Sequence, residues 1–336
     1  MKHRSLLVLL CLPLVFKGGA ASPLSWLEYQ GPAPGARAAG IANCMAAIPD
    51  DPLMVFWNPA GLAVMASPIF NLSYQHSSGL LQNALFSGPK RVDYISYASQ
   101  KVGFSWRSLA RFKEEGLSAE GSDSNYHYLR YGADEFTLAL AGRQEESPWS
   151  FGLSAKLIWA RATRLEQRFA AGGWGRSHLW EDQGLGCGFD VGLQGVYQSW
   201  RVGISGQNLW GRVYWTEFND DRLKPHLVGG LAWNRQKNLN LYIGGEKFLG
   251  DQAPRLRYSI GGEYRYSLDQ SGAATLRAGY SQQYQGPKDG YSWSLGLGYY
   301  YKRMRLDASG INLRDPSSGQ WRWSYVGSIN IFAVQE

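Results

Sequence analysis

The sequence predicts an all-β protein: a transmembrane antiparallel β-barrel of about fourteen strands with an N-terminal plug inside its lumen. Three observations predict this fold. The chain begins with an export signal, its bulk consists of long segments in which every second residue is apolar, and a segment rich in Pro, Ala and Gly separates the two. These features divide the chain into a signal peptide (1–21), a plug (22–66) and a barrel (67–336).

The first residues are typical of a secretory signal. Lys2 and Arg4 precede an apolar run over residues 5–16, and small residues follow at 18–21. The run is much shorter than the ~20 residues that a membrane-spanning helix needs, so we expect cleavage after Ala21 rather than anchoring. The chain is therefore expected to meet export and barrel-assembly machinery during its biogenesis.

Charge and cysteine content exclude some classes of protein. The formal net charge of +7 falls to about +4 once the three cations before Ala21 are removed, and no basic run with interleaved aromatics indicates a nucleic-acid partner. Cys11 leaves with the signal. Cys44 and Cys187 could pair only if the fold brought them together, so no disulfide framework is indicated.

Strict alternation dominates the chain from residue 67 onward and is clearest over 291–301. Successive side chains of a strand point to opposite faces, and here one face is apolar and the other is Ser- and Gly-rich. Aromatic residues lie at both ends of the apolar face, as expected where rings occupy the two headgroup layers of a membrane. The apolar face consists of Tyr291, Trp293, Leu295, Leu297, Tyr299 and Tyr301.

A soluble sandwich also alternates, so strand length and connections carry the argument for a barrel. Many segments approach the ~9 to 11 residues of a tilted membrane crossing, and long and short connections alternate along most of the chain. We expect the longest loops at 113–133, 163–184 and 211–224, and the pattern at 91–99 is blurred. Strands are predicted at 68–75, 91–99, 102–112, 134–143, 149–162, 185–198, 200–210, 225–235, 239–248, 256–267, 273–284, 291–302, 304–313 and 321–333.

Charged residues occur in mid-strand on the faces assigned to the lumen. Unpaired charge inside a barrel of this size is costly, so we expect most of these residues to form cross-strand ion pairs, with a preference for anionic solutes as the alternative. The candidate lumen charges are Arg107, Glu135, Lys156, Asp190, Arg201, Arg257, Glu263, Arg265, Arg277, Arg305, Asp307 and Arg322.

Three short motifs occur in order between the signal and the barrel. Their order and spacing resemble the N-terminal signature of the FadL-type outer-membrane transporter superfamily, most closely its PorV/PorQ-like branch. The resemblance covers residues 35–63 in motif and the rest of the chain in architecture, and residues 41–46 depart from the more Gly- and Ala-rich run of relatives. The motifs are Gly35-Ala36-Arg37-Ala38-Ala39-Gly40, Asp50-Asp51-Pro52 and Trp57-Asn58-Pro59-Ala60-Gly61-Leu62-Ala63.

The resemblance implies that residues 22–66 fold inside the barrel as a hatch. Asn58-Pro59 is expected to set a turn, and Arg37 is placed to pair with Asp50 or Asp51. These residues either gate the lumen or only fix the shape of the plug. By resemblance, aromatics of the outer loops are candidates for a substrate entry groove, with packing among the loops as the alternative: Tyr126, Tyr128, Tyr131, Trp174, Trp180, Tyr214, Trp215 and Phe218.

The implied function is passive transport of hydrophobic or amphipathic small molecules across the outer membrane of a Gram-negative-type bacterium, with membrane lipid around the barrel. The alternative is a docking or shuttle component of a protein secretion system, because PorV/PorQ-like proteins include such components. An enzyme is not indicated: the sequence has no nucleophile elbow, no phosphate loop and no metal-ligand spacing among its histidines. No cofactor or metal is expected.

Overall fold

The computed structural model confirms the predicted fold class. It describes residues 33–77, 90–120, 123–170, 173–234, 238–249, 255–268, 272–285, 288–314 and 319–333, so the predicted signal peptide lies outside the described residues. Two short α-helices, α1 (Ala36–Gly40) and α2 (Met54–Trp57), and a 3-10 helix η1 (Pro59–Val64) precede the strands.

Fourteen strands of the described chain close into one antiparallel ring. Each strand pairs with its neighbour in sequence, β15 pairs with β1, and β6 pairs with β7, while the two-residue β8 lies beside β7 outside the ring order. The strands are β1 (Ile69–Ser77), β2 (Lys90–Ser99), β3 (Val102–Glu120), β4 (Asp123–Arg143), β5 (Trp149–Ala170), β6 (Gly173–Tyr197), β7 (Trp200–Tyr214), β8 (Asp221–Arg222), β9 (His226–Trp233), β10 (Leu239–Phe248), β11 (Arg255–Ser267), β12 (Ala273–Gln285), β13 (Lys288–Tyr301), β14 (Met304–Arg314) and β15 (Trp321–Phe332).

The alternation sorts into exterior and interior as predicted. In β13, Trp293, Leu295 and Leu297 point outward and are 56 to 61% exposed, whereas Ser294 is buried inside the ring. Large apolar side chains cover the outside of the other ring strands in the same way, and we call this band the outer belt. A continuous apolar exterior around a closed ring is the surface that a bilayer requires.

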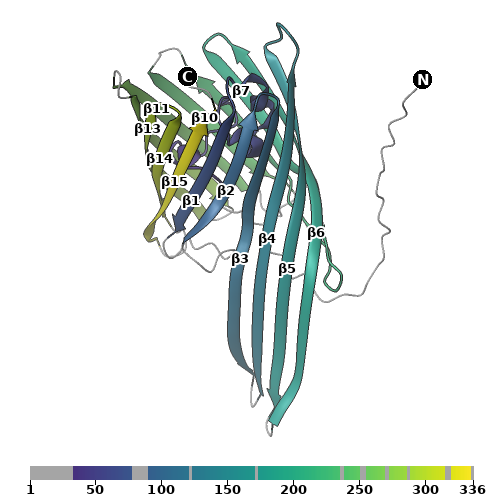
Figure 1. Ribbon diagram of the computed structural model, residues 1–336. Coiled ribbons are helices and arrows are strands. Elements are labelled where there is room, and N and C mark those ends of the chain that lie inside the picture. The colour runs from purple at the N-terminus through teal and green to yellow at the C-terminus, as the bar shows by residue number, and fades with distance from the viewer. Residues whose placement is uncertain are drawn as a thin grey trace, which may run out of the picture.

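The predicted loops at 113–133 and 163–184 are wrong, because these residues extend β3, β4, β5 and β6 into strands of 19 to 25 residues. The four strands project well beyond the rest of the barrel, at the end opposite the short turns (Figure 1). We call residues 111–120, 123–132, 161–170 and 173–183 the blade. Both faces of the blade lie outside the belt, so neither face needs to be apolar and the alternation that marks a membrane strand disappears.

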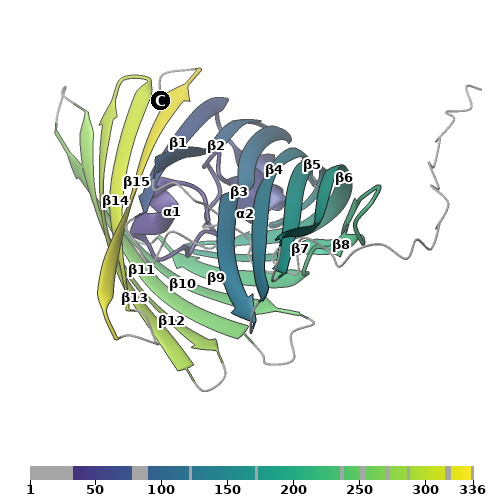
Figure 2. The same ribbon diagram turned by 90° about the horizontal axis from the view of Figure 1, so that it is seen from below.

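Residues 33–66, which we call the plug, lie inside the ring of strands (Figure 2). Plug side chains such as Met45, Met54 and Trp57 form the main buried cluster together with inward-facing wall residues such as Tyr94 and Tyr242. Among the described residues no helix has the length and apolar character needed to cross a membrane. The core of this barrel is thus made where the plug meets the wall.

Candidate functional site

Local sequence sets the turns of the plug. Gly35 begins α1 with a φ of 95°, which an L side chain rarely adopts. Asn58 caps η1: its Oδ1 accepts a hydrogen bond from the amide of Ala60 at 3.2 Å, and Pro59 occupies the first turn, where no amide donor is needed. The turn predicted at Asn58-Pro59 is therefore present.

The same asparagine ties the plug to the wall. Its Nδ2 donates to the carbonyl of Ala46 at 2.8 Å and to that of Leu193 in β6 at 3.1 Å. On β7, Gln207 donates to the plug carbonyls of Phe56 and Trp57 at 2.8 and 3.2 Å. Gln207 thus satisfies carbonyls that α2 leaves open, and Asn58 satisfies a plug carbonyl outside the helices, so wall and plug side chains replace backbone hydrogen bonds in this irregular segment.

Glycines of the inner wall let the plug backbone approach closely. A Cβ at Gly152 would lie 2.3 Å from the amide nitrogen of Ala60, and one at Gly203 would lie 1.9 Å from the carbonyl oxygen of Ala46. Both contacts are with plug backbone, which cannot rotate away as a side chain can. These wall positions therefore exclude any larger residue while the plug keeps its place.

Substitution of Gly203 tests this packing. We expect Gly203→Val to push the plug from β7 and to raise ion conductance in planar bilayers several-fold, because overpacking costs roughly 1–3 kcal/mol. Gly229→Val is the matched control, since no atom lies within 4 Å of a Cβ placed at Gly229. Equal conductance of the two variants would contradict close packing at Gly203.

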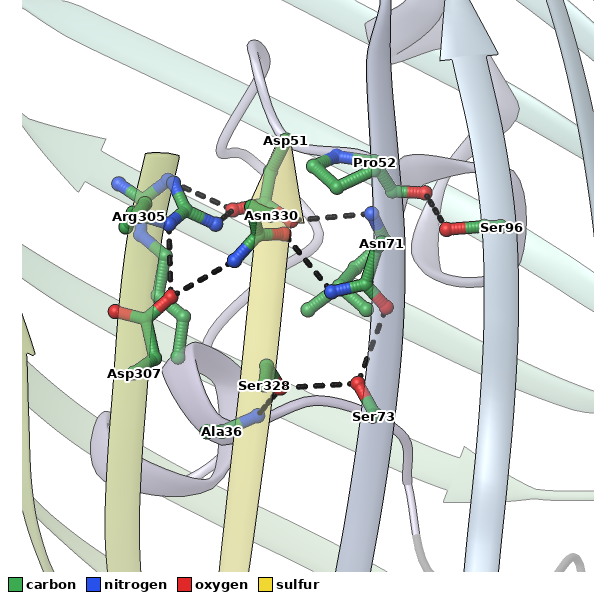
Figure 3. A network of polar contacts seen from close by, with 12 residues as sticks. Ala36, Asp51, Pro52, Asn71, Ser73, Ser96, Arg305, Asp307, Ser328 and Asn330 are labelled. Atoms are coloured by element: carbon green, nitrogen blue, oxygen red, sulfur yellow. Dashed lines mark hydrogen bonds and ion pairs between the residues drawn. The ribbon is translucent and has the colours of Figure 1, made fainter. Parts of the chain in front are cut away.

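Three arginines and three carboxylates form a closed ring of ion pairs between the plug and strands β11, β12 and β14. Each guanidinium contacts two carboxylates and each carboxylate contacts two guanidiniums, at 2.6 to 3.0 Å. All six side chains are buried, and their formal charges cancel. Figure 3 shows the part of the ring around Asp51, Arg305 and Asp307. In order, the ring consists of Arg37, Asp51, Arg305, Asp307, Arg277 and Glu263.

Asp51 joins the two halves of this ring. Burial opposes its ionisation, but Arg305 and Arg37 outweigh that cost and hold the pKa of Asp51 below its usual range. The backbone amide of Leu53 also donates to Asp51 at 3.0 Å. Of the two predicted partners of Arg37, Asp51 is the one that pairs with it, while the neighbouring Asp50 is exposed.

Close to this ring of ion pairs, polar wall side chains form hydrogen bonds with both ends of α1. The hydroxyl of Ser309 donates to the carbonyl of Ala36 at 2.6 Å, and Ser294 donates to that of Gly40 at 3.2 Å. The amide of Ala36 in turn donates to Ser328 at 2.8 Å (Figure 3). The remaining motif residues, Trp57 and Gly61, lie buried within the plug, where Gly61 packs against Met54.

A second buried charge network lies on β3 to β7. Arg107 pairs with Glu135 at 3.1 Å and Lys156 pairs with Asp190 at 2.9 Å, so this network is also neutral. The Arg107 guanidinium lies 4.6 Å from the ring centre of Phe56 in the plug. The prediction of cross-strand pairing is thus confirmed here, because Arg107 and Glu135 are direct partners in the β-ladder.

The other predicted lumen charges lie nearer the ends of the barrel. Arg257 pairs with Glu246 at 3.1 Å, and Arg265 lies over the ring of Tyr300 at 4.7 Å. Neither Arg201 nor Arg265 forms an ion pair with another described residue, and Arg322 donates to the side chain of Gln320 at 3.2 Å. A preference for anionic solutes stays a prediction that would rest on Arg201 and Arg265.

The ladder between β2 and β3 stops short of the blade, and we call the unpaired stretch of the wall beyond it the opening. Among the described residues the ladder runs from the pair Ser99–Val102 to the pair Tyr94–Arg107, although both strands continue beyond that last pair. A bulge at Asp93 and another at Leu109 lie where the strands separate. Bulges bend a strand and end its pairing, so the two bends together account for the opening. The bulge buries both Asp93 and Tyr94, which explains the blurred alternation at 91–99.

Residues 215–223, which we call the strap, pack against the inner wall beside this opening. Trp215 and Phe218 of the strap contact a cluster of buried apolar residues on β3, β4 and β5. Asp182 on β6 holds the strap by accepting the amides of Glu217 and Phe218 at 2.6 and 3.2 Å. We call this the strap cluster, and it consists of Leu109, Ala110, Phe112, Tyr131, Ala133, Ile158, Ala160, Ala162, Val213, Trp215, Phe218 and Leu223.

The predicted entry-groove aromatics divide between the two faces of the wall. Tyr131, Trp215 and Phe218 belong to the strap cluster, and Trp180 packs against it. The ladder partners of Tyr126 and Tyr128 place these two residues on the outer face of the blade. Tyr214 lies opposite Leu185 of the belt. The side chain of Trp174 lies outside the described part of the chain. The residues that sequence analysis missed are the apolar wall positions, such as Ile158, that complete the cluster.

Solved structures share the fold of this chain over most of its length. A FadL homologue of Pseudomonas aeruginosa is 12% identical, with 90% of this chain and 98% of that chain covered and a TM-score of 0.62. The fold is that of the FadL-type transporters. The CymD monoaromatic hydrocarbon channel (14% identity, 90% and 98% covered, TM-score 0.61) and the Ralstonia pickettii toluene transporter TbuX (15%, 92% and 100%, 0.59) have the same FadL-type fold.

No family model and no curated protein matches the sequence. At 12 to 15% identity the solved structures establish the FadL-type fold, which confirms that part of the resemblance. The narrower resemblance to the PorV/PorQ-like branch stays a prediction from the motifs at residues 35–63.

Proposed function

We propose that the chain is a passive outer-membrane channel for hydrophobic or amphipathic small molecules and performs no covalent chemistry. In this proposal residues 1–21 direct export, the outer belt holds the barrel in the outer membrane of a Gram-negative-type bacterium, and the plug blocks the direct path through the lumen. The proteins of the same fold described as a hydrocarbon channel and a toluene transporter support this choice of substrate class.

One observation carries the proposal: the apolar strap cluster adjoins the opening in the wall. Leu109 is both a bulge residue at the edge of the opening and a member of the cluster, and Phe112 follows on the same strand. A hydrophobic solute that entered between the strap and the wall would therefore reach the Leu109 edge of the opening along an apolar surface. It would leave laterally through the opening into the membrane, since the plug and its ion pairs occupy the lumen.

Placing a charge beside the opening tests this route. We expect Leu109→Asp to reduce uptake of radiolabelled toluene by cells that express the protein by about tenfold, because an ionised carboxylate in an apolar passage is costly to approach and to bury. Leu117→Asp is the matched control, because Leu117 lies on the same strand in the blade and is 69% exposed.

Heat-dependent mobility on gels should show that both variants form barrels. Equal uptake by folded Leu109→Asp and Leu117→Asp would exclude the route beside β3. Loss in both would place the determinant in the blade instead.

The blade favours a second candidate function, docking of exported proteins. The ladder joins β3 to β2 only up to Arg107 and joins β6 to β7 only from Leu185, so both outer edges of the blade lack a ring neighbour in the described chain. Unpaired edges are sites for strand addition by another protein. Photo-crosslinking from Leu117 and Leu179, 69% and 62% exposed, should then capture specific exported proteins in cells, whereas capture of lipid alone would favour transport.

A further inference from the structure

The outer face of β3 to β5 changes character in layers along the strands. The belt ends at Trp159 on β5, and each of the three strands carries a cation within its next two outward positions. Beyond them the face becomes apolar again at Leu165 and Leu117, within the blade. A cationic layer therefore separates the belt from Leu165 and Leu117 farther along the blade.

Four cations make up this layer, and the ladder places them as neighbours. Lys113 on β3 lies directly opposite Arg130 on β4. Arg111 on β3 and Arg161 on β5 lie on either side of Gly132, which contributes no side chain between them. Like charges in directly opposed positions destabilise a sheet, so the opposed Lys113 and Arg130, with Arg111 and Arg161 in the next row, indicate that an anion balances them.

The intramolecular acids balance the layer only in part. Asp134 accepts from Arg111 at 2.5 Å and Glu115 pairs with Lys113 at 3.0 Å. Arg161 lies over the ring of Trp159 at 4.2 Å, and Arg130 is exposed.

The only further acid among the outward positions of these rows is Glu181, on β6 opposite Thr163. With Glu181 included, the outer face keeps a net positive charge. Arg130 and Arg161 have no carboxylate partner among the described residues.

The height of the layer matches the lipid headgroups. A strand rises ~3.3 Å per residue and tilts by about 40° in a barrel, so each residue adds roughly 2.5 Å along the membrane normal. Arg161 is two positions beyond Trp159, and Arg130 pairs with Thr163, four positions beyond. The cations thus lie about 5 to 10 Å above the belt, where the polar layer of a bilayer is roughly 5 to 8 Å thick.

We propose that Arg111, Lys113, Arg130 and Arg161 form a binding site for the phosphate-bearing headgroup of an outer-leaflet lipid. The guanidinium groups offer paired donors that match phosphate oxygens, and the aromatic face of Trp159 lies below them at the level of the first acyl carbons. Four cations in two neighbouring rows of the ladder suit a headgroup that carries two phosphates. The bound lipid would brace the base of the blade where it leaves the membrane.

The test uses the full mature protein in phosphatidylcholine nanodiscs, titrated with diphosphoryl lipid A and followed by native mass spectrometry. We expect Arg130→Gln/Arg161→Gln to weaken lipid A binding about tenfold to thirtyfold, because each basic residue near an anionic lipid surface contributes roughly 1 kcal/mol. Monophosphoryl lipid A should bind the unaltered protein more weakly than the diphosphoryl form.

Arg143→Gln/Lys302→Gln is the matched control. It also removes two exposed cations, but at the end of β4 and in the short turn after β13, at the opposite end of the barrel. Lipid A binding that is equal in the two double variants would overturn the proposal. Displacement of lipid A by millimolar inorganic phosphate would overturn it as well, because the site would then recognise the free anion rather than a lipid.

Discussion

Deletion of residues 22–65 should convert the barrel into an open pore, with steady ion conductance in planar bilayers and rapid swelling of liposomes in sugar solutions. The plug lies inside the ring of strands and shares its largest buried cluster with the wall. Without it, the inner wall still presents polar side chains such as Asn71, Ser73 and Ser96, which water can solvate. The intact protein should show only the leak of empty liposomes to sugars.

The deletion leaves the wall half of the ion-pair ring with two arginines, Arg277 and Arg305, and two carboxylates, Glu263 and Asp307. Because these charges cancel, the open pore should show little selectivity from this part of the wall. Heat-dependent mobility on gels checks that the deleted form still closes. A folded deletion variant that leaks no more than the intact protein would show that the plug does not block the lumen.

Asp51→Asn should release the plug without deleting it. The substitution keeps the shape of the side chain but leaves Arg37 and Arg305 short of a carboxylate, and breaking a buried ion pair costs roughly 3–5 kcal/mol. The population of released plug should therefore rise by about two to four orders of magnitude. Asp50→Asn is the matched control, since Asp50 is adjacent and exposed.

Cys44 supplies the readout. It is buried, and burial together with the nearby Glu246 raises the pKa of its thiol to about 12, so a maleimide should label it slowly while the plug is in place. In a Cys187→Ser background, Asp51→Asn should label much faster than Asp50→Asn. Similar labelling rates for the two variants would show that the ring of ion pairs does not hold the plug in place.

Acidification should act in the same direction as Asp51→Asn. Because the folded pKa of Asp51 is lowered, its contribution to plug stability is present above the unfolded value of about 4 and is lost as pH falls through the folded value. Conductance of the unaltered protein should therefore rise below about pH 4. Asp51→Asn should lack the part of this rise that Asp51 causes.

Two features near the opening, the blade and the bulges, show why the local sequence pattern does not predict strands correctly where they leave the membrane or bend. The blade was predicted as loops because its two faces do not differ in polarity, although its ladder continues unbroken from Phe112 to Glu120. The bulges at Asp93 and Leu109 depend on how many residues the partner strand places opposite them. The sequence of one strand does not determine how many residues its partner places opposite it.

The sequence by itself determined the barrel, its alternation of exterior and interior, the turn at Asn58-Pro59 and the pairing of Arg37 with one of two adjacent aspartates. These follow from period, from local hydrogen bonding and from the cost of unpaired buried charge. The tertiary structure alone decided that Asp51 closes a ring with Arg277 and Arg305, and that the strap lies beside the opening. Both join segments separated by more than 100 residues in the chain, and only closure of the barrel fixes which side chains meet across its lumen.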